Sequence, residues 1–337
     1  MLRRLSPVRV ALGLLLALAV VVGILWYLPA NGYYIFLPDK AHPLSPIINV
    51  VGAKRHPDSG GVYFVDVSVR KARLLERLFP GLHDGASLKK VSNVLGGLSE
   101  VVERRAEVHA MSISQQVAAA VAFKTLGYRI PARATGALIL GVDGSAPVGR
   151  VLEAGDVVVS LDGKRVRTVD DLRRLLGRHT PGDTVQIRFR RNGGIRTASV
   201  RTISDPHVKG RALLGVNPDQ AVSIKLPLRV RVEIGGVGGS SAGLAFALEL
   251  LQKLGRDVER GHKIAATGAL GLDGSIGEIG GVKQKTIGAR EAHVDVFLVP
   301  AGPNAREARH YANGLRIIPV KTFPQALRAL ATLPHIK

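Results

Sequence analysis

Two side chains in the C-terminal third of the chain have the types and surroundings of a nucleophile and its base. Ser241 lies in the glycine-rich run 235–243, directly before a predicted helix, and Lys283 follows two glycines at the start of another predicted helix. A serine hydroxyl attacks a carbonyl carbon only when a neighbouring group removes its proton. The helix dipole and burial both disfavour an ammonium in a first helical turn. The sequence therefore predicts a Ser241–Lys283 pair, and it predicts that Lys285, two positions further on, faces solvent.

The same glycine-rich run is compatible with three other roles. It is similar to the phosphate-binding loop of GHMP-type kinases, and amides at a helix N-terminus hold anions. No G-x-x-x-x-G-K-[ST] pattern occurs in the chain, however. Residues 239–243 satisfy the G-x-S-x-G pattern of α/β-hydrolases, with Asp295 and His310 downstream in the order that fold uses. Ser240 and Ser241 also suit the N-cap of the following helix.

Three spaced motifs resemble the proteolytic domain of the Lon peptidases, and they occur in the order of that family. They are the turn Ser241-Ala242-Gly243, the strand ending in Thr267-Gly268 and the turn Gly280-Gly281-Val282-Lys283. The resemblance covers roughly residues 228–330. It implies a serine nucleophile and a lysine base, with no metal and no cofactor. The active-site residues that it implies are the pair Ser241 and Lys283, supported by Gly239, Ser240 and Thr267.

Two positions depart from the family pattern. Ser240 stands where a proline usually precedes the nucleophile, and Ala269 stands where an acidic residue usually follows the Thr-Gly pair. Neither change removes a reacting group, but both bear on the tuning of the lysine. Thr267 would also suit an ordinary strand position.

Earlier segments resemble the elements that open a Lon-type fold. Residues 62–69 alternate between two faces, which predicts one strand. Residues 86–105 are expected to be helical, and Ser112 is expected to begin a further helix that ends near Gly127. The peptidase domain is thus predicted to be discontinuous, with a second module inserted in it.

That second module, at residues 131–203, consists of short β runs between Gly and Asp turns. Its order, with the turn Gly155-Asp156 and a hairpin at Asn192-Gly193, resembles a PDZ domain of the kind found on extracytoplasmic bacterial proteases. A groove between one strand and one helix is predicted to capture extended polypeptides by β-augmentation. The predicted groove residues are Gly136, Ala137, Leu138 and Leu172, and the segment 204–226 is predicted to be a linker.

The N-terminal segment predicts a membrane anchor. Residues 10–28 carry no charge, and such a stretch is long enough to cross about 30 Å of hydrocarbon as a helix. Basic residues precede it, which predicts a cytoplasmic N-terminus and an extracytoplasmic remainder. These residues are Arg3, Arg4 and Arg9. A cleaved signal peptide is the alternative, but Leu28-Pro29-Ala30 lacks the small-x-small pattern of a cleavage site. Residues 31–46 are predicted to be a spacer.

Composition excludes several classes of protein. The chain of 337 residues has a net charge of +21, but its basic residues are scattered and no nucleic-acid-binding motif accompanies them. Nucleic acid is therefore not an expected partner. The absence of cysteine excludes disulfides, thiolate metal sites and a cysteine nucleophile. The ten histidines show no metal-binding spacing.

Taken together, the sequence predicts an α+β fold: a Lon-type proteolytic domain with an inserted PDZ-like β-sandwich or barrel and one N-terminal transmembrane helix. The predicted function is ATP-independent cleavage of unfolded or flexible polypeptides by a serine endopeptidase of the cell membrane. The resemblance also implies a homo-oligomeric ring, of six copies. A non-catalytic PDZ adaptor with a decayed peptidase fold is the alternative. The predicted segments are 1–30 (cytoplasmic tip and anchor), 44–128 and 206–337 (peptidase), and 129–205 (PDZ).

Overall fold

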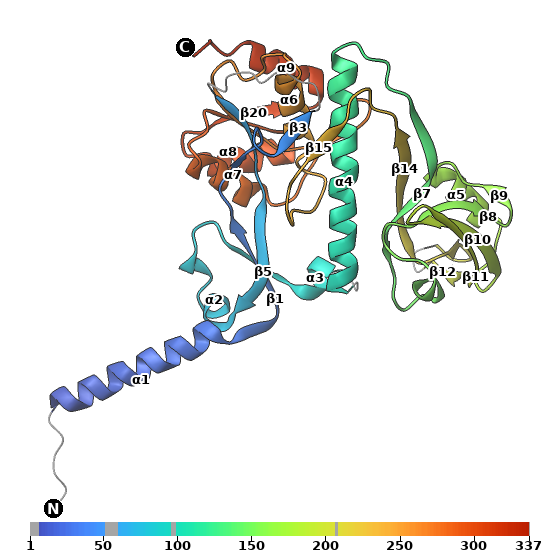
Figure 1. Ribbon diagram of the computed structural model, residues 1–337. Coiled ribbons are helices and arrows are strands. Elements are labelled where there is room, and N and C mark those ends of the chain that lie inside the picture. The colour runs from blue at the N-terminus through green and yellow to red at the C-terminus, as the bar shows by residue number, and fades with distance from the viewer. Residues whose placement is uncertain (1–6, 51–59, 96–98, 206–207, 337) are drawn as a thin grey trace, which may run out of the picture.

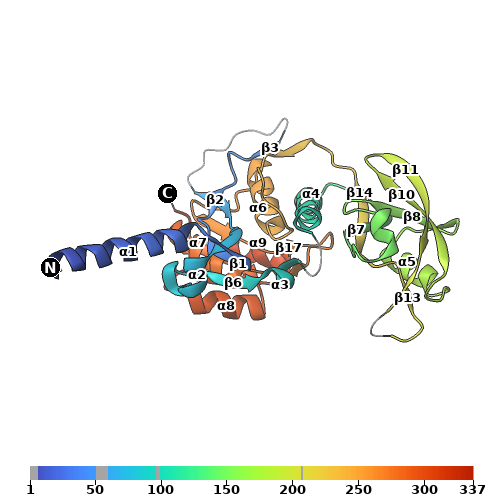
Figure 2. The same ribbon diagram turned by 90° about the horizontal axis from the view of Figure 1, so that it is seen from below.

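The computed structural model describes residues 7–50, 60–95, 99–205 and 208–336. Helix α4 (Glu100–Thr125) runs through the middle of the molecule, with an α/β body on one side and a separate β-domain on the other (Figures 1 and 2). Helix α1 (Pro7–Tyr27) projects away from the α/β body. The predicted α+β fold is confirmed only as a mixture of helices and strands, and the glycine-rich run lies in the α/β body.

The α/β body is built on a five-stranded sheet of order β2-β4-β16-β19-β20. Four of its strands are parallel, and only the short strand β2 is antiparallel to its neighbour. Parallel sheets bury both faces, and this explains the nearly continuous apolar runs of these strands. The strands are β2 (His42–Pro43), β4 (Gly61–Phe64), β16 (Lys263–Ala266), β19 (Val296–Pro300) and β20 (Arg316–Val320).

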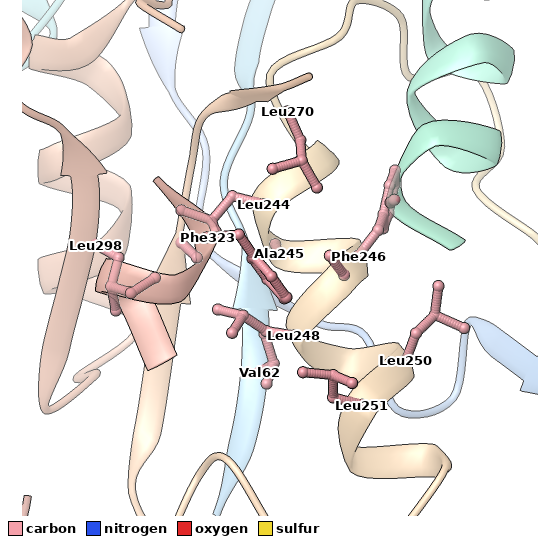
Figure 3. Close-up of a cluster of buried hydrophobic side chains, with 14 of the residues drawn as sticks. Val62, Leu244, Ala245, Phe246, Leu248, Leu250, Leu251, Leu270, Leu298 and Phe323 are labelled. Atoms are coloured by element: carbon pink, nitrogen blue, oxygen red, sulfur yellow. The ribbon is translucent and has the colours of Figure 1, made fainter. Parts of the chain in front are cut away.

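Helices cover both faces of this sheet. One face packs against α4, α6 (Gly243–Lys253) and α9 (Phe323–Ala331). Figure 3 shows side chains of α6, among them Leu244 and Leu248, turned toward Val62 and Leu298 of the sheet. The other face packs against α7 (Val282–Glu291) and α8 (Pro303–Tyr311). The two helices with the motif residues, α6 and α7, therefore lie on opposite faces.

The prediction of a single strand at 62–69 is wrong. Strand β4 ends at Phe64, and the chain leaves the large sheet before β5 (Val67–Arg73) begins. Strand β5 pairs with β1 (Pro29–Pro38), which in turn pairs with β6 (Ser87–Lys90). Alternation within a segment does not show that its two halves pair with different partners. The break between β4 and β5 places Asp66 at the edge of the α/β body.

Three other predicted segments also change. The expected spacer at 31–46 contains most of β1 and all of β2, and the expected helix at 86–105 contains a strand, the short helix α3 (Val91–Leu95) and the start of α4. Helix α4 does not begin at Ser112: its N-cap is Ser99, whose side chain accepts a hydrogen bond from Val102 N.

The remaining short elements are α2 (Leu74–Leu78), β3 (Ile48–Val50), β9 (Lys164–Arg165), β12 (Ile203–Ser204), β13 (Ala212–Leu213), β15 (Val230–Val232), β17 (Ala269–Leu270), β18 (Ile276–Gly277) and two 3-10 turns at Pro80–Leu82 and Pro147–Arg150.

The β-domain is a sheet of order β11-β10-β8-β7-β14, covered by helix α5. Its hairpin turn is formed by Asn192 and Gly193, which both have positive φ, as a tight two-residue turn requires. Strand β14 lies within the predicted linker 204–226 and pairs with β7 along the full length of both strands. The elements are β7 (Ala132–Val142), β8 (Val157–Leu161), α5 (Val169–Leu176), β10 (Thr184–Arg191), β11 (Gly194–Arg201) and β14 (Val216–Ile224).

This pairing contradicts the predicted peptide groove. Strand β7 has β14 on one side and β8 on the other, so its edge is not available to a peptide. Ala137, Leu138 and Leu172 are almost completely buried in the domain core, and Gly136 pairs with Ala221. The strand at the end of the sheet, next to α5, is β14.

Helix α1 was predicted to contain a transmembrane segment at 10–28. Across the described residues, no helix meets the combined requirement of length and apolar character for a membrane span. The predicted span is therefore not confirmed. Of the three basic residues used for orientation, Arg3 and Arg4 lie outside the described residues.

Candidate active site

The nucleophile turn is fixed from both sides by hydrogen bonds. Gly239 N donates to Glu107 O of α4 at 2.9 Å, and Ser114 Oγ of the same helix donates to Ser240 O at 3.0 Å. On the other side, Gly268 N donates to Ser241 O at 2.7 Å. Ser241 is thereby held two residues before the first residue of α6.

The lysine beside Ser241 is Lys285. Its Nζ lies 2.6 Å from Ser241 Oγ and 3.4 Å from Thr267 Oγ1. The Lys285 residue is only 4% exposed. An amine at this distance is within reach of the hydroxyl proton, which is the geometric requirement for a general base.

The predicted position of Lys283 is wrong. Lys283 Nζ donates to Ala86 O at 3.1 Å and lies over the ring of Tyr311. Two residues along an α-helix point in nearly opposite directions, so α7 can present only one of these lysines to Ser241. The predicted solvation of Lys285 is wrong for the same reason.

Helix α7 is buried over most of its surface, and Lys285 lies on the side that packs against the sheet. Val282, Thr286 and Ala289 are buried with it, at the spacing of one helix face. Gly288 adds a close approach to the loop before β2: a Cβ atom there would lie 1.8 Å from Asp39 O. A larger residue at 288 would clash with this loop, so that either the loop or α7, with Lys285, would have to move.

The pKa of Lys285 is lowered to about 8, chiefly because burial disfavours its ammonium form. The charge of Asp66 acts in the opposite direction and raises the Lys285 pKa. Burial in turn raises the pKa of the Asp66 carboxyl, with Asp39 as the second cause. With this pKa, part of the lysine is already deprotonated near pH 7. Only the deprotonated amine can accept a proton from the serine hydroxyl.

The predicted supporting residues have different surroundings. Thr267 is buried, lies next to Lys285 and donates its hydroxyl to Ser241 O at 3.1 Å. The N–H of Gly239 is bonded to Glu107 O, so it is not available to stabilise an oxyanion. Ser240 is exposed, and its carbonyl also accepts Gly243 N at 3.3 Å.

The α/β-hydrolase interpretation is not supported by the positions of its two partner residues. Asp295 lies 3.6 Å from His262 Nδ1 and accepts Lys263 N, at the far end of the large sheet. His310 packs edge-on against Tyr311. Lys285, rather than a histidine, lies at the serine hydroxyl.

A cleft of about 980 Å³ opens on the Ser241–Lys285 pair. It is bounded by the glycine-rich turn, by the start of β5, by α4 and by the N-terminal turn of α7. A cleft of this size is large enough for several residues of an extended polypeptide.

One set of side chains beside the cleft has the geometry of metal ligands. Atoms of Asp39, His42 and Asp66 lie within 4.8 Å of one another. His42 lies between the two carboxylates, 3.7 Å from Asp39 and 3.9 Å from Asp66, so an ion-pair arrangement accounts for the cluster. The sequence predicted no metal site here.

Two parts of the chain match family profiles. Residues 216–332 match the Lon protease (S16) C-terminal proteolytic domain, and residues 104–202 match the PDZ domain. The PDZ match begins inside α4 and ends before β14, although β14 completes the sheet. The domain boundaries drawn from the sequence remain predictions.

Curated relatives match over short stretches. A probable periplasmic serine endoprotease, DegP-like, of Halomonas elongata is 44% identical over 71 residues, which are 21% of this chain and 15% of that protein. The Lon protease of Neorickettsia sennetsu is 33% identical over 93 residues, 26% of this chain and 11% of that protein. The mitochondrial Lon protease homolog of Zea mays is 33% identical over 127 residues, 35% of this chain and 13% of that protein. This chain therefore spans only a small part of the length of each relative.

Among solved structures, the PDZ domain of the SdrC-like protein of Listeria monocytogenes is 24% identical with a TM-score of 0.24, covering 25% of this chain and 87% of that chain. The two family profiles and the Lon relatives support a serine endopeptidase domain combined with a PDZ domain.

Proposed function

We propose that this chain is a serine endopeptidase in which Ser241 is the nucleophile and Lys285 is the general base. The main support for this proposal is the 2.6 Å contact between Lys285 Nζ and Ser241 Oγ inside a cleft. The lowered pKa of Lys285 supports it, because only a neutral amine can accept a proton. The intact pair argues against the alternative of a decayed, purely adaptor-like fold.

The chemistry follows from the positions of these two groups. Neutral Lys285 accepts the hydroxyl proton while Ser241 Oγ attacks the peptide carbonyl carbon, and the ammonium then donates a proton to the leaving amine. Water, deprotonated by the same amine, hydrolyses the acyl-serine ester and restores both groups. Gly243 N and Leu244 N at the start of α6 already donate to Ser240 O and Gly268 O. The oxyanion donors of the proposal are therefore the N–H groups of Ser241 and Ala242, at the turn before α6.

The first test is cleavage of an unfolded protein such as casein, without ATP, by the full chain in a nonionic detergent. The full chain is needed because Ala30 is buried and Leu74 N donates to Leu28 O. Ser241→Ala is expected to lower the initial rate at least about a thousandfold, as removing the nucleophile does in serine proteases. Equal rates in both proteins would contradict the proposal.

The proposal also includes cleavage without ATP, which rests on the lack of a nucleotide-binding motif in the sequence. Cleavage that required ATP would contradict this part of the proposal only. A protein that bound peptides but cleaved none would favour the adaptor.

Anchoring to the cell membrane, with the peptidase outside the cytoplasm, is also part of the proposal. Apolar side chains of α1 such as Leu12 and Leu16 are each 68% exposed, and a lipid phase would cover them. The full chain is expected in the membrane fraction after a high-salt wash and in the soluble fraction only after detergent. Release by salt alone would contradict the anchor.

Two further parts of the proposal concern partners. Polypeptides are expected to add to the edge of β14 beside α5 rather than to β7, because β-augmentation needs an unpaired strand edge. In the register of β14 against β7, the N–H of Val222 points to the free edge. Binding of a labelled peptide that is unaffected by Val222→Pro would contradict this position. The ring of identical copies rests on the Lon resemblance alone, and a monomeric mass in sedimentation velocity would contradict it.

A further inference from the structure

The charge of the cleft is opposite to that of the chain. Lys and Arg outnumber Asp and Glu by 47 to 26 in the sequence, whereas acidic residues outnumber basic ones along the cleft. The acidic residues are Asp39, Asp66, Glu100, Glu103, Glu107 and Glu307, and the basic ones are Lys89, Arg104, Lys283 and Lys285. A cleft lined by one sign of charge concentrates ligands of the opposite sign.

Three of the four basic side chains in the cleft contact uncharged groups of the protein. Lys285 is buried against Ser241, and Lys283 donates to Ala86 O. Lys89 Nζ lies 4.9 Å from the centre of the Phe36 ring. Among the described residues, none of these three amines lies within ion-pair distance of a carboxylate.

Half of the carboxylates have partners within the protein. Glu100 forms an ion pair with Lys71 at 2.9 Å, and Asp39 and Asp66 share His42. Glu103 and Glu107 differ: across residues 7–50, 60–95, 99–205 and 208–336, no cationic side chain lies within ion-pair distance of either.

Glu103 and Glu107 stand one turn apart on the same face of α4. Like charges at this spacing repel and destabilise a helix. Desolvation raises the pKa of the Glu107 carboxyl, with Glu103 as the second cause and Arg104 acting in the opposite direction. A cation brought by a ligand would remove this repulsion.

Glu107 is also in contact with the nucleophile turn. Its carbonyl accepts Gly239 N, and a Cβ atom at Gly238 would lie 2.6 Å from Glu107 Cβ and 3.0 Å from Oε2. Only glycine at 238 allows α4 to approach this closely. The Glu107 carboxylate therefore lies beside the residue three positions before Ser241.

We propose that Glu103 and Glu107 form a subsite for a lysine or arginine side chain of the substrate, close to the scissile bond. The preferred substrate is then a cationic segment of an unfolded polypeptide. This inference rests on the proposed peptidase function and adds the substrate class to it. Glu103 and Glu107 are specificity-determining residues and take no part in the proton transfers.

The first experiment maps the bonds that the full chain cleaves in unfolded casein, by mass spectrometry of the fragments. Lysine and arginine are expected to be enriched severalfold at one position near the cleaved bonds. In Glu103→Gln/Glu107→Gln the enrichment should disappear, while cleavage at other bonds continues. Glu291→Gln, an exposed carboxylate outside the cleft, is the matched control and should cleave as wild type does. Ser241-dependent cleavage without enrichment would overturn the subsite and leave the peptidase intact.

The second experiment is independent of catalysis. It measures fluorescence anisotropy of a labelled lysine-containing peptide, and of its Lys→Gln analogue, with the Ser241→Ala full chain. The lysine peptide is expected to bind about tenfold more tightly, an effect on the scale of two half-exposed charge pairs. Because the protein carries a net charge of +21, the rest of its surface would repel this peptide. Equal binding of the two peptides, or a preference that survives Glu103→Gln/Glu107→Gln, would overturn the inference even if no protein were cleaved in the first experiment.

Discussion

Replacing Lys285 by methionine is expected to lower the rate of cleavage of an unfolded protein by at least about a thousandfold. Methionine keeps most of the buried stem and removes the amine, so it introduces no unsatisfied polar group. Ser241 then has no proton acceptor, because the group 2.6 Å from its hydroxyl is missing. The measurement is the initial rate of the purified full chain above pH 8, where the wild-type lysine is largely neutral.

Lys283→Met is the matched control, because it makes the same substitution two residues away on the same helix. It is expected to retain activity within about threefold, since Lys283 Nζ reaches only a carbonyl and an aromatic ring at the rim of the cleft. Loss of activity in Lys283→Met with activity kept in Lys285→Met would restore the assignment made from the sequence motif. Unchanged melting temperatures in both variants would show that a change in rate comes from the loss of the amine and not from unfolding.

The nucleophile and the helix after it were predictable because their signals are local. A glycine-rich run directly before a predicted helix identifies Ser241, and α6 does begin at Gly243. The choice between two lysines required the register of α7. In that register Lys285 lies on the same face as Val282 and Ala289, which pack against the sheet, and Lys283 does not.

Long-range pairing was not predictable from the same signals. Nothing within 62–69 indicates that β4 joins the large sheet while β5 pairs with β1. Strand β14 likewise resembles a linker in sequence, because four of its nine residues are polar, and only its pairing with β7 shows that it completes a sheet. Strand pairing is decided by the partner strand, which a single segment does not specify.

The rate of cleavage is expected to rise with pH through about 8 and to be constant above it. The reacting form of Lys285 is the neutral amine, and its pKa is lowered to about 8. Below that pKa, kcat/KM should fall about tenfold for each pH unit, so at pH 6 it should be about one hundredth of the plateau. The measurement is kcat/KM of a fluorogenic peptide between pH 6 and pH 10.

Asp66→Asn is expected to move this profile to lower pH. The Asp66 carboxylate favours the ammonium form of Lys285 and so raises its pKa, and removing that charge makes deprotonation easier. The midpoint should fall by about half a unit or more, and the variant should exceed wild type in relative activity near pH 6.5. Asp39 and His42 also face Asp66, so the shift is read from the midpoint of each full profile and not from the rate at one pH.

An unchanged midpoint in folded Asp66→Asn would show that the Asp66 charge does not act on the group that titrates. A wild-type midpoint near 10 would contradict the burial of Lys285, because a solvated lysine titrates at about 10.4. His310→Ala is the control for a histidine base, and it should leave the midpoint where it is, since His310 contacts Tyr311 rather than Ser241. A midpoint that depends on Asp66 and not on His310 would identify the titrating base as Lys285, buried beside Ser241.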